Sequence, residues 1–209
     1  MEHFEQHPIR TLETIRDANP RLSSFEFAKY VYRPQSRRDE RKTFSVDAQV
    51  VSDDWLTNEI ASLAPTEELA LQSRVKLHDG SYLHIPMIDF IASSADQSLA
   101  VGEWVDRAVF LHIDIYATGR SFHGYGLRLL TDQDWQQFMG QLLLANFPGD
   151  PPVVDTRWIG HRLVAGYGAL RWSRNTNVYR QLPKKLASLG DFYGRSLVPS
   201  TIEANDVAR

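Results

Sequence analysis

The sequence predicts an α+β protein, and three observations lead to that class. A chain of 209 residues with 43% apolar and 23% charged residues has the composition of a globular protein that buries a proper core. From residue 82 onward, strand and helix patterns follow one another in the order β-α-β-β-α-β. That order is the split βαβ plan of ferredoxin-like and RNA-recognition-motif-like domains. The first third mixes strands and helices, and we expect it to form a small N-terminal α/β annex.

Composition also excludes several classes of protein. No apolar run approaches the roughly 20 residues that a membrane helix needs. Cysteine is absent, which removes disulfides, thiolate zinc sites and cysteine nucleophiles together. The first seven residues contain neither a basic segment nor an apolar one, so they do not resemble a signal peptide. We therefore expect a cytoplasmic protein with no membrane partner.

The annex is expected to span residues 1–80. Aromatic and β-branched residues indicate its strands, Pro20 ends its first helix, and Ser52 is a suitable N-cap for its second helix. The expected elements are a helix at 7–19, strands at 25–32 and 43–51 joined by a basic turn at 33–42, a helix at 53–63, a short helical stretch from 66–68 and a turn at 78–81.

The core is expected to span residues 81–209. The helix that Thr131 caps has an apolar stripe with i, i+3, i+4 spacing, at Trp135, Phe138, Met139 and Leu142. The expected elements are strands at 82–90, 109–117 and 121–130, a fourth strand from 153–155, and helices at 95–107 and 131–146. The usual sheet order for this plan places the first strand between the third and the fourth.

Alternation along the strand at 109–117 separates an apolar face from a polar one. If Thr118 and Gly119 form a two-residue hairpin loop, the next strand pairs with it in a defined register. The cross-strand pairs expected on the open face of the sheet are Tyr116 with Ser121, Asp114 with His123, and His112 with Tyr125. A longer loop would shift this register.

Charge is distributed unevenly along the chain. The net charge is −3, yet residues 157–195 carry +7 and the remainder carries −10. A second basic group contains Arg33, Arg37, Arg38, Arg41 and Lys42. Concentrated positive charge on an acidic protein indicates either a local site for phosphates or nucleic acid, or a solvated face paired with the acidic remainder.

Several short motifs follow one another in a specific order. The string GRSFH at 119–123 contains Ser-x-His, an acid ends MID at 87–89, and VVD at 153–155 follows. Further on lie WIGHRL at 158–163 and GALRWS at 168–173. Together these motifs resemble the archaeo-eukaryotic primase (primase-polymerase) superfamily, and its primase 1D-like group in particular. The resemblance covers roughly residues 80–185 and implies a primase-like catalytic core.

The resemblance implies a metal-dependent nucleotidyltransferase that binds nucleoside triphosphates and DNA or RNA. Its chemistry needs Mg2+ or Mn2+ held by carboxylates, and guanidinium groups suit the triphosphate. The implied catalytic residues are Asp89, His123 and Asp155. The implied metal ligands are Asp89 and Asp155, with Asp114 as an additional candidate. The implied nucleotide-binding residues are Arg120, Ser121, His123, Arg162, Arg171 and Ser173. A core this short also allows partner subunits in a larger complex.

One departure from the family pattern leaves alternatives open. The first family motif usually carries a second acid, whereas this chain has Asp89-Phe90-Ile91. Asp114 could supply the missing ligand, or it could only orient His123 by a cross-strand hydrogen bond. Alternatively, the protein binds nucleotide or nucleic acid without catalysis.

A third hypothesis belongs to a different enzyme class. His112, Asp114 and His161 fit the 2-His-1-carboxylate pattern of an Fe(II)/2-oxoglutarate dioxygenase, with Arg171 on the co-substrate. Such enzymes carry this pattern on a jelly-roll of strands, whereas residues 131–146 predict an amphipathic helix between the ligands.

Overall fold

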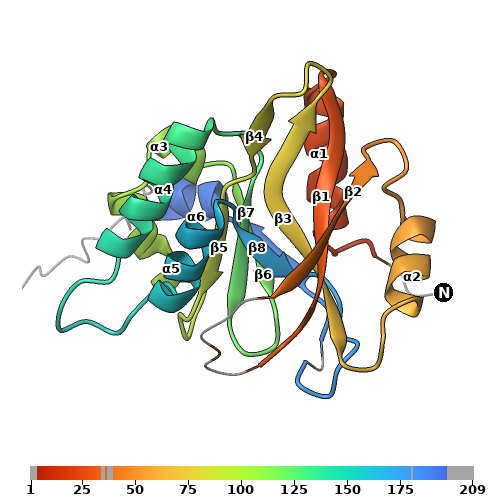
Figure 1. The fold of residues 1–209 in the computed structure, drawn as a ribbon. Helices are drawn as coiled ribbons and strands as arrows, with labels where there is room; N and C mark the ends of the chain where they lie inside the picture. The colour runs from red at the N-terminus through yellow and green to blue at the C-terminus, as the bar shows by residue number, and fades with distance from the viewer. Residues whose placement is uncertain (1–3, 34–35, 37–39, 180, 197–209) are drawn as a thin grey trace, which may run out of the picture.

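Two antiparallel β-sheets lie next to each other in the computed structural model of the chain, which describes residues 4–33, 36, 40–179 and 181–196. Figure 1 shows the later helices gathered beside the second sheet, and the first two helices beside the first sheet. The α+β class is therefore confirmed. Within the described residues, every helix is too short or too polar to cross a lipid bilayer.

The first sheet is built around one long central strand. Its order is β2-β1-β3-β4, and β8 also pairs with β3. The first half of β3 pairs with β8, at Ala70 and Arg171, and its second half pairs with β4, at Arg74 and His84. Its strands are β1 (Leu22–Val31), β2 (Arg41–Asp47), β3 (Glu67–Leu77), β4 (Tyr82–His84) and β8 (Ala169–Arg171). Strands from both sides of residue 80 thus share this sheet, and the domain boundary expected there stays a prediction.

The second sheet has the strand order that the split βαβ plan predicts. Its strands are β5 (Met87–Phe90), β6 (Ile113–Ala117), β7 (Phe122–Gly126) and β9 (Lys184–Ser188), in the order β5-β7-β6-β9. On its other side, β5 meets the segment at 153–155 through a bridge between Phe90 and Val154. The first core strand therefore lies between the third and the fourth, as predicted.

The helices begin where the sequence offers caps. The side chain of Ser52 accepts a hydrogen bond from the N–H of Trp55 over 3.2 Å, and Thr131 accepts one from Asp134 over 3.2 Å. Both predicted N-caps are confirmed. The helices are α1 (Ile9–Ala18), α2 (Asp53–Ala61), the 3-10 helix η1 (Gln97–Glu103), α3 (Arg107–Phe110), α4 (Asp132–Leu144), α5 (Thr156–Ala165) and α6 (Leu189–Ser196).

The second sheet is covered on both faces. On one face, Ile88, Ile113 and Ile115 belong to the core that includes the apolar stripe of α4. On the other face, Tyr116 and Tyr125 belong to the core of the first sheet. The expectation of an open polar face is therefore wrong, because the N-terminal elements pack against it.

Three local expectations are also wrong. Residues 66–68 do not begin a helix but lead into β3, where the run from Glu68 to Ser73 is buried. The expected helix at 95–107 consists of η1 followed by α3, so the next strand begins at Ile113 rather than at 109. The hairpin loop contains four residues, 118–121, because Ala117 pairs with Phe122. The register is consequently shifted by two residues, and Tyr116 faces His123 while Asp114 faces Tyr125.

Candidate functional site

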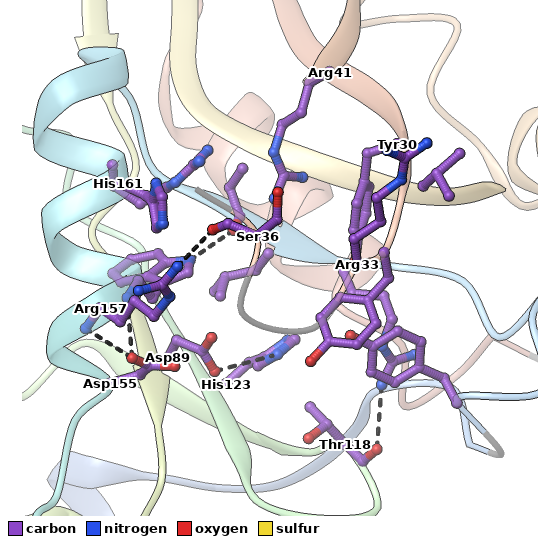
Figure 2. Close-up of a pocket in the computed structure, with 18 of the residues that line it drawn as sticks. Tyr30, Arg33, Ser36, Arg41, Asp89, Thr118, His123, Asp155, Arg157 and His161 are labelled. Atoms are coloured by element: carbon purple, nitrogen blue, oxygen red, sulfur yellow. Dashed lines mark hydrogen bonds and ion pairs between the residues drawn. The ribbon is translucent and has the colours of Figure 1, made fainter. Parts of the chain in front are cut away.

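A cavity of about 990 Å³ opens between the two sheets. Its walls come from the end of β1, the start of β2, the end of β5, the β6–β7 loop, α5 and β8 (Figure 2). Most of the residues that the family resemblance singles out line it: Asp89, Arg120, Ser121, His123, Asp155, Arg162 and Arg171. The fold thus brings together side chains that are far apart in the sequence.

Asp89 and Asp155 are held side by side by the backbone. The N–H of Asp155 donates to the carbonyl of Asp89 over 2.9 Å, next to the bridge between Phe90 and Val154. Because Phe90 and Val154 point into the helical core, their neighbours Asp89 and Asp155 point to the opposite face, where the cavity lies. Two carboxylates therefore meet in the cavity through ordinary strand pairing.

The two carboxylates differ in their hydrogen bonds. Oδ1 of Asp155 accepts from the N–H groups of Arg157 and Trp158, over 2.8 and 3.0 Å, and so caps α5. Within the described part of the chain, no group donates a hydrogen bond to the carboxylate of Asp89. Nε2 of His123 lies 3.8 Å from its Oδ1 (Figure 2). Asp155 therefore has a structural role as a cap, and Asp89 has none that is comparable.

Burial and charge shift the ionisation of the site. Burial, with the like charge of Asp155 as the second cause, raises the pKa of Asp89 to about 7, against the opposing effect of Arg171 and Arg41. Burial and the positive charge of Arg171 hold the pKa of His123 well below its usual value, so its imidazole is neutral. A cation placed near Asp89 would favour its ionised form.

The β6–β7 loop is tied to the end of β5. Oγ of Ser121 lies within hydrogen-bond distance of the carbonyls of Phe90, at 2.5 Å, and Ala92, at 3.1 Å. The exposed Arg120 lies with its guanidinium 5.5 Å from the ring of Tyr179. The Ser-x-His segment is thus anchored beside Asp89.

Arg171 connects three segments at the cavity wall. Its guanidinium donates to three carbonyls. One belongs to Ser173, one to Gln181 at 3.0 Å and one to Thr118 at 3.2 Å. It also lies 4.2 Å from the ring centre of Tyr179. Among the described residues, no carboxylate forms an ion pair with it. A buried positive charge therefore lies in the wall, and the hydrogen-bond acceptors of its guanidinium are neutral carbonyls.

The two basic groups of the sequence meet in this cavity. Arg33, Arg41 and Lys42 come from the first group, and Arg157, Arg162 and Arg171 come from the second. Arg37, Arg38 and Arg180 lie outside the described residues. Among the described lining residues, eight are Lys or Arg and four are Asp or Glu. The cavity is therefore positively charged around a pair of carboxylates.

Two site residues expected from the sequence lie elsewhere. Ser173 is fully buried, where its hydroxyl donates to Glu68 and accepts from the N–H of Leu69, and it is not among the cavity residues. Asp114 accepts hydrogen bonds from Lys185 over 2.8 Å and Ser188 over 2.5 Å, and it is not among the cavity residues. The predicted pairing of Asp114 with His123 is wrong because the register is shifted, whereas its role as a metal ligand stays a prediction.

The dioxygenase hypothesis is wrong as well. His112 lies before β6 and is exposed, whereas Asp114 is buried against β9 and only His161 lines the cavity. Among the described residues, no group of three or more His, Asp or Glu side chains is close enough to hold a metal ion alone. The sheets are also not those of a jelly-roll.

Comparison with family models agrees with this geometry. The model of the AEP-like family, archaeo-eukaryotic primase 1D-like, matches residues 47–184, which is more than half of the chain. The chain belongs to this AEP-like family. Membership places it in the superfamily of primase-like nucleotidyltransferases. No curated protein and no solved structure matches the sequence.

The AEP-like match covers only part of the cavity. Asp89, His123, Asp155 and Arg171 lie within the matched range, whereas Lys29 to Lys42 precede it. Tyr30 and Arg41, whose guanidinium lies 4.1 Å from the ring centre of Tyr30, thus belong to a part of the cavity wall outside the matched region.

Sequence reasoning missed several residues of the site. Tyr30, Tyr179 and Arg157 line the cavity, and Glu68 holds the segment that follows β8. The basic group at 33–42 was the one available signal for this wall, because the aromatic residues carry no motif.

Proposed function

We propose that the cavity catalyses metal-dependent transfer of a nucleotide onto a nucleic acid. The single observation that carries the proposal is the pairing of Asp89 with Asp155 inside a positively charged cavity. Like charges directly opposite each other on a sheet are destabilising, so this arrangement favours a site that a cation completes. Membership of the primase-like superfamily points to the same chemistry.

The side chains present fit a divalent cation of the magnesium type. Mg2+ is commonly bound by one or two carboxylates together with substrate phosphates and water, rather than by a cage of protein ligands. Asp89 and Asp155 would hold the cation. A third carboxylate is not needed, because phosphates and water would supply the remaining ligands. When bound, Mg2+ or Mn2+ would help to ionise the attacking hydroxyl and neutralise charge on the phosphates.

The chain's own residues would bind and orient the triphosphate. Arg162 and Arg171 are buried in the wall, and a guanidinium there offers charge with little cost in side-chain ordering. The neutral imidazole of His123, beside Asp89, would donate a hydrogen bond to a phosphate oxygen. Because it carries no charge, it would not repel the divalent cation that Asp89 and Asp155 would hold. Ser121 would hold the loop in place through its bonds to β5.

A binding module without catalysis is the second candidate function. It is favoured by Ile91, which lines the cavity at the position where the family pattern has its second acid. In that case the carboxylate pair would bind the cation of a metal-nucleotide complex, and no phosphodiester bond would form. The two candidates differ in turnover and not in binding.

The decisive experiment incubates the protein with a primed template, labelled nucleotides and Mn2+ or Mg2+. We expect incorporation that EDTA abolishes and that Asp89→Asn lowers more than about 100-fold. Asp17→Asn, on the exposed side of α1, has the same charge change and should leave the rate unchanged. Normal incorporation by the double variant Asp89→Asn, Asp155→Asn would place the chemistry elsewhere. Binding of nucleotide without incorporation by the unmodified protein would favour the binding module.

A further inference from the structure

An aromatic and basic rim lies at the mouth of the cavity. We define the rim by Tyr32, Arg33, Arg120 and Tyr179, all of which line the cavity. The rings of Tyr32 and Tyr179 meet edge to face, with centroids 5.4 Å apart and an interplanar angle of 63°. Arg120 lies 5.5 Å from the ring of Tyr179. Two segments far apart in the sequence therefore build one surface.

Tyr32 is the most available aromatic ring of the cavity. It is 37% exposed, whereas Tyr30 is 8% exposed and lies beneath the guanidinium of Arg41. Trp158 is packed against both hydrophobic cores, and its indole N–H donates to the carbonyl of Ala169 over 2.9 Å. Tyr179 already contacts two guanidinium groups, from Arg120 and Arg171. A flat ligand would thus find its stacking surface on Tyr32.

The charge next to Tyr32 is also available. Arg33 is exposed, and among the described residues no carboxylate forms an ion pair with its side chain. By contrast, Lys29 of β1 is paired with Glu59 over 2.6 Å. Figure 2 shows Arg33 on the side of the cavity away from Asp155. An exposed ring thus lies apart from the carboxylate pair, beside a cation with which no carboxylate of the described residues pairs.

Exposed aromatic rings interleaved with basic side chains suit one class of ligand. Bases of a single strand stack on such rings while their phosphates meet the cations, whereas the bases of a duplex are stacked inside it. Tyr32 and Arg33 also precede residue 47, where the family match begins, so they are a feature of this chain outside the matched range.

We propose that the rim binds single-stranded nucleic acid, with Tyr32 as the stacking surface for a base and Arg33 as a phosphate contact. The inference rests on the proposed function in one respect: the bound strand would be the nucleic acid that leads to the carboxylate pair. Binding itself needs neither a divalent cation nor a nucleotide, so the rim can be tested separately.

The test measures binding of single-stranded DNA and RNA oligonucleotides of about 12 nucleotides, in EDTA, by fluorescence anisotropy. We expect Tyr32→Ala to weaken binding about fivefold or more, and Tyr32→Phe to bind as the unmodified protein does, because the ring is kept. Arg33→Gln should weaken binding and lower the slope of log affinity against log salt by about 1. A 2-aminopurine base in the strand should be quenched on binding, and Tyr32→Ala should remove that quenching.

Matched controls separate the rim from general effects. Tyr82→Ala removes another tyrosine, whose ring centre lies 4.0 Å from the guanidinium of Arg74 and which is outside the cavity. Arg21→Gln makes the same charge change as Arg33→Gln, also outside the cavity. Both should bind like the unmodified protein. Equal binding by Tyr32→Ala and the unmodified protein, or no binding of either strand, would overturn the inference. Strand binding without incorporation would count against the proposed function alone.

Discussion

Asp89 and Asp155 lie directly opposite each other across the edge of the second sheet, joined by a main-chain hydrogen bond of 2.9 Å. Strand pairing fixes the distance between their backbones without help from the side chains. The two carboxylates therefore stay together although their charges repel. Burial, with this repulsion as the second cause, raises the pKa of Asp89 to about 7. The pairing at the edge of the second sheet is therefore what positions the two carboxylates of the site.

Substitution at Asp155 should separate its two roles. Asparagine is as good an N-cap as aspartate, so Asp155→Asn should unfold at nearly the same temperature while losing metal-dependent incorporation. Asp155→Ala also removes the cap of α5, which costs about 1 kcal/mol and lowers the melting temperature by about 2–4 °C. Thermal unfolding and incorporation, measured on the same samples, check both effects. Full activity of Asp155→Asn would contradict the proposed role in metal binding.

Arg171 is expected to stabilise the cavity wall as well as to bind phosphate. Lysine cannot reproduce its fork of donors to Thr118, Ser173 and Gln181. We expect Arg171→Lys to lower the free energy of unfolding by about 2 kcal/mol, measured by urea denaturation. The control Arg120→Lys is exposed and should change stability by less than about 0.5 kcal/mol. Equal stability of the two variants would show that the three carbonyl contacts contribute little.

Glu68 is a fully buried carboxylate that holds the segment after β8. Its oxygens accept from the hydroxyls of Ser173 and Thr176 and from the N–H groups of Asn175 and Thr176, over 3.1 and 2.7 Å for the latter two. Glu68→Gln places an amide donor against these donors, so we expect a loss of about 2–4 kcal/mol in unfolding free energy. Glu103→Gln, an exposed counterpart, should be neutral in the same denaturation assay. A stable Glu68→Gln variant would mean that the segment rearranges around the amide.

His7 should make the protein less stable in mild acid. Its Nε2 donates to the carbonyl of Trp172 over 2.9 Å and its Nδ1 accepts from the N–H of Ile9. Protonation of Nδ1 would therefore break the hydrogen bond from Ile9. Burial lowers its pKa from 6.5 to about 3. Between these values the unfolded chain binds more protons than the folded one, so stability falls as the pH falls below 6.5.

The magnitude expected from His7 is about 1.4 kcal/mol for each pH unit in that range. Urea denaturation between pH 7.5 and pH 4.5 should therefore show a steeper loss for the unmodified protein than for His7→Gln, which has no proton to take up there. Because other buried groups titrate in both proteins, the difference between the two curves is the quantity to compare. Parallel curves would show that His7 takes up its proton without unfolding.

Local patterns were reliable where local contacts decide the structure. The apolar stripe of α4 and the cap at Thr131 predicted that helix because both features depend on residues a few positions apart. The same reasoning was wrong at residues 66–68, because Glu68 is not a surface residue at a helix start. Its burial depends on hydroxyl and amide donors about 105 to 108 positions away, which no local pattern reveals.

The candidate site was predictable in its residue types but not in its geometry. Asp89, His123 and Asp155 were recognised from motif order, and the structure places all three in one cavity. Asp114 was misplaced because the hairpin loop has four residues rather than two, and loop length sets the register of a strand pair. Ser173 was misplaced because its burial depends on Glu68, which is remote in the sequence.

By itself, the sequence determined the split βαβ order of the core strands, the caps at Ser52 and Thr131, the family motifs and the concentration of positive charge in two segments. Only the tertiary structure decided that the N-terminal elements cover the second sheet, and that Tyr32 and Arg33 meet Tyr179 at the mouth of one cavity. The physical reason is range: hydrophobic periodicity and capping act over a few residues. Packing between sheets joins surfaces whose residues are separated by a hundred positions or more.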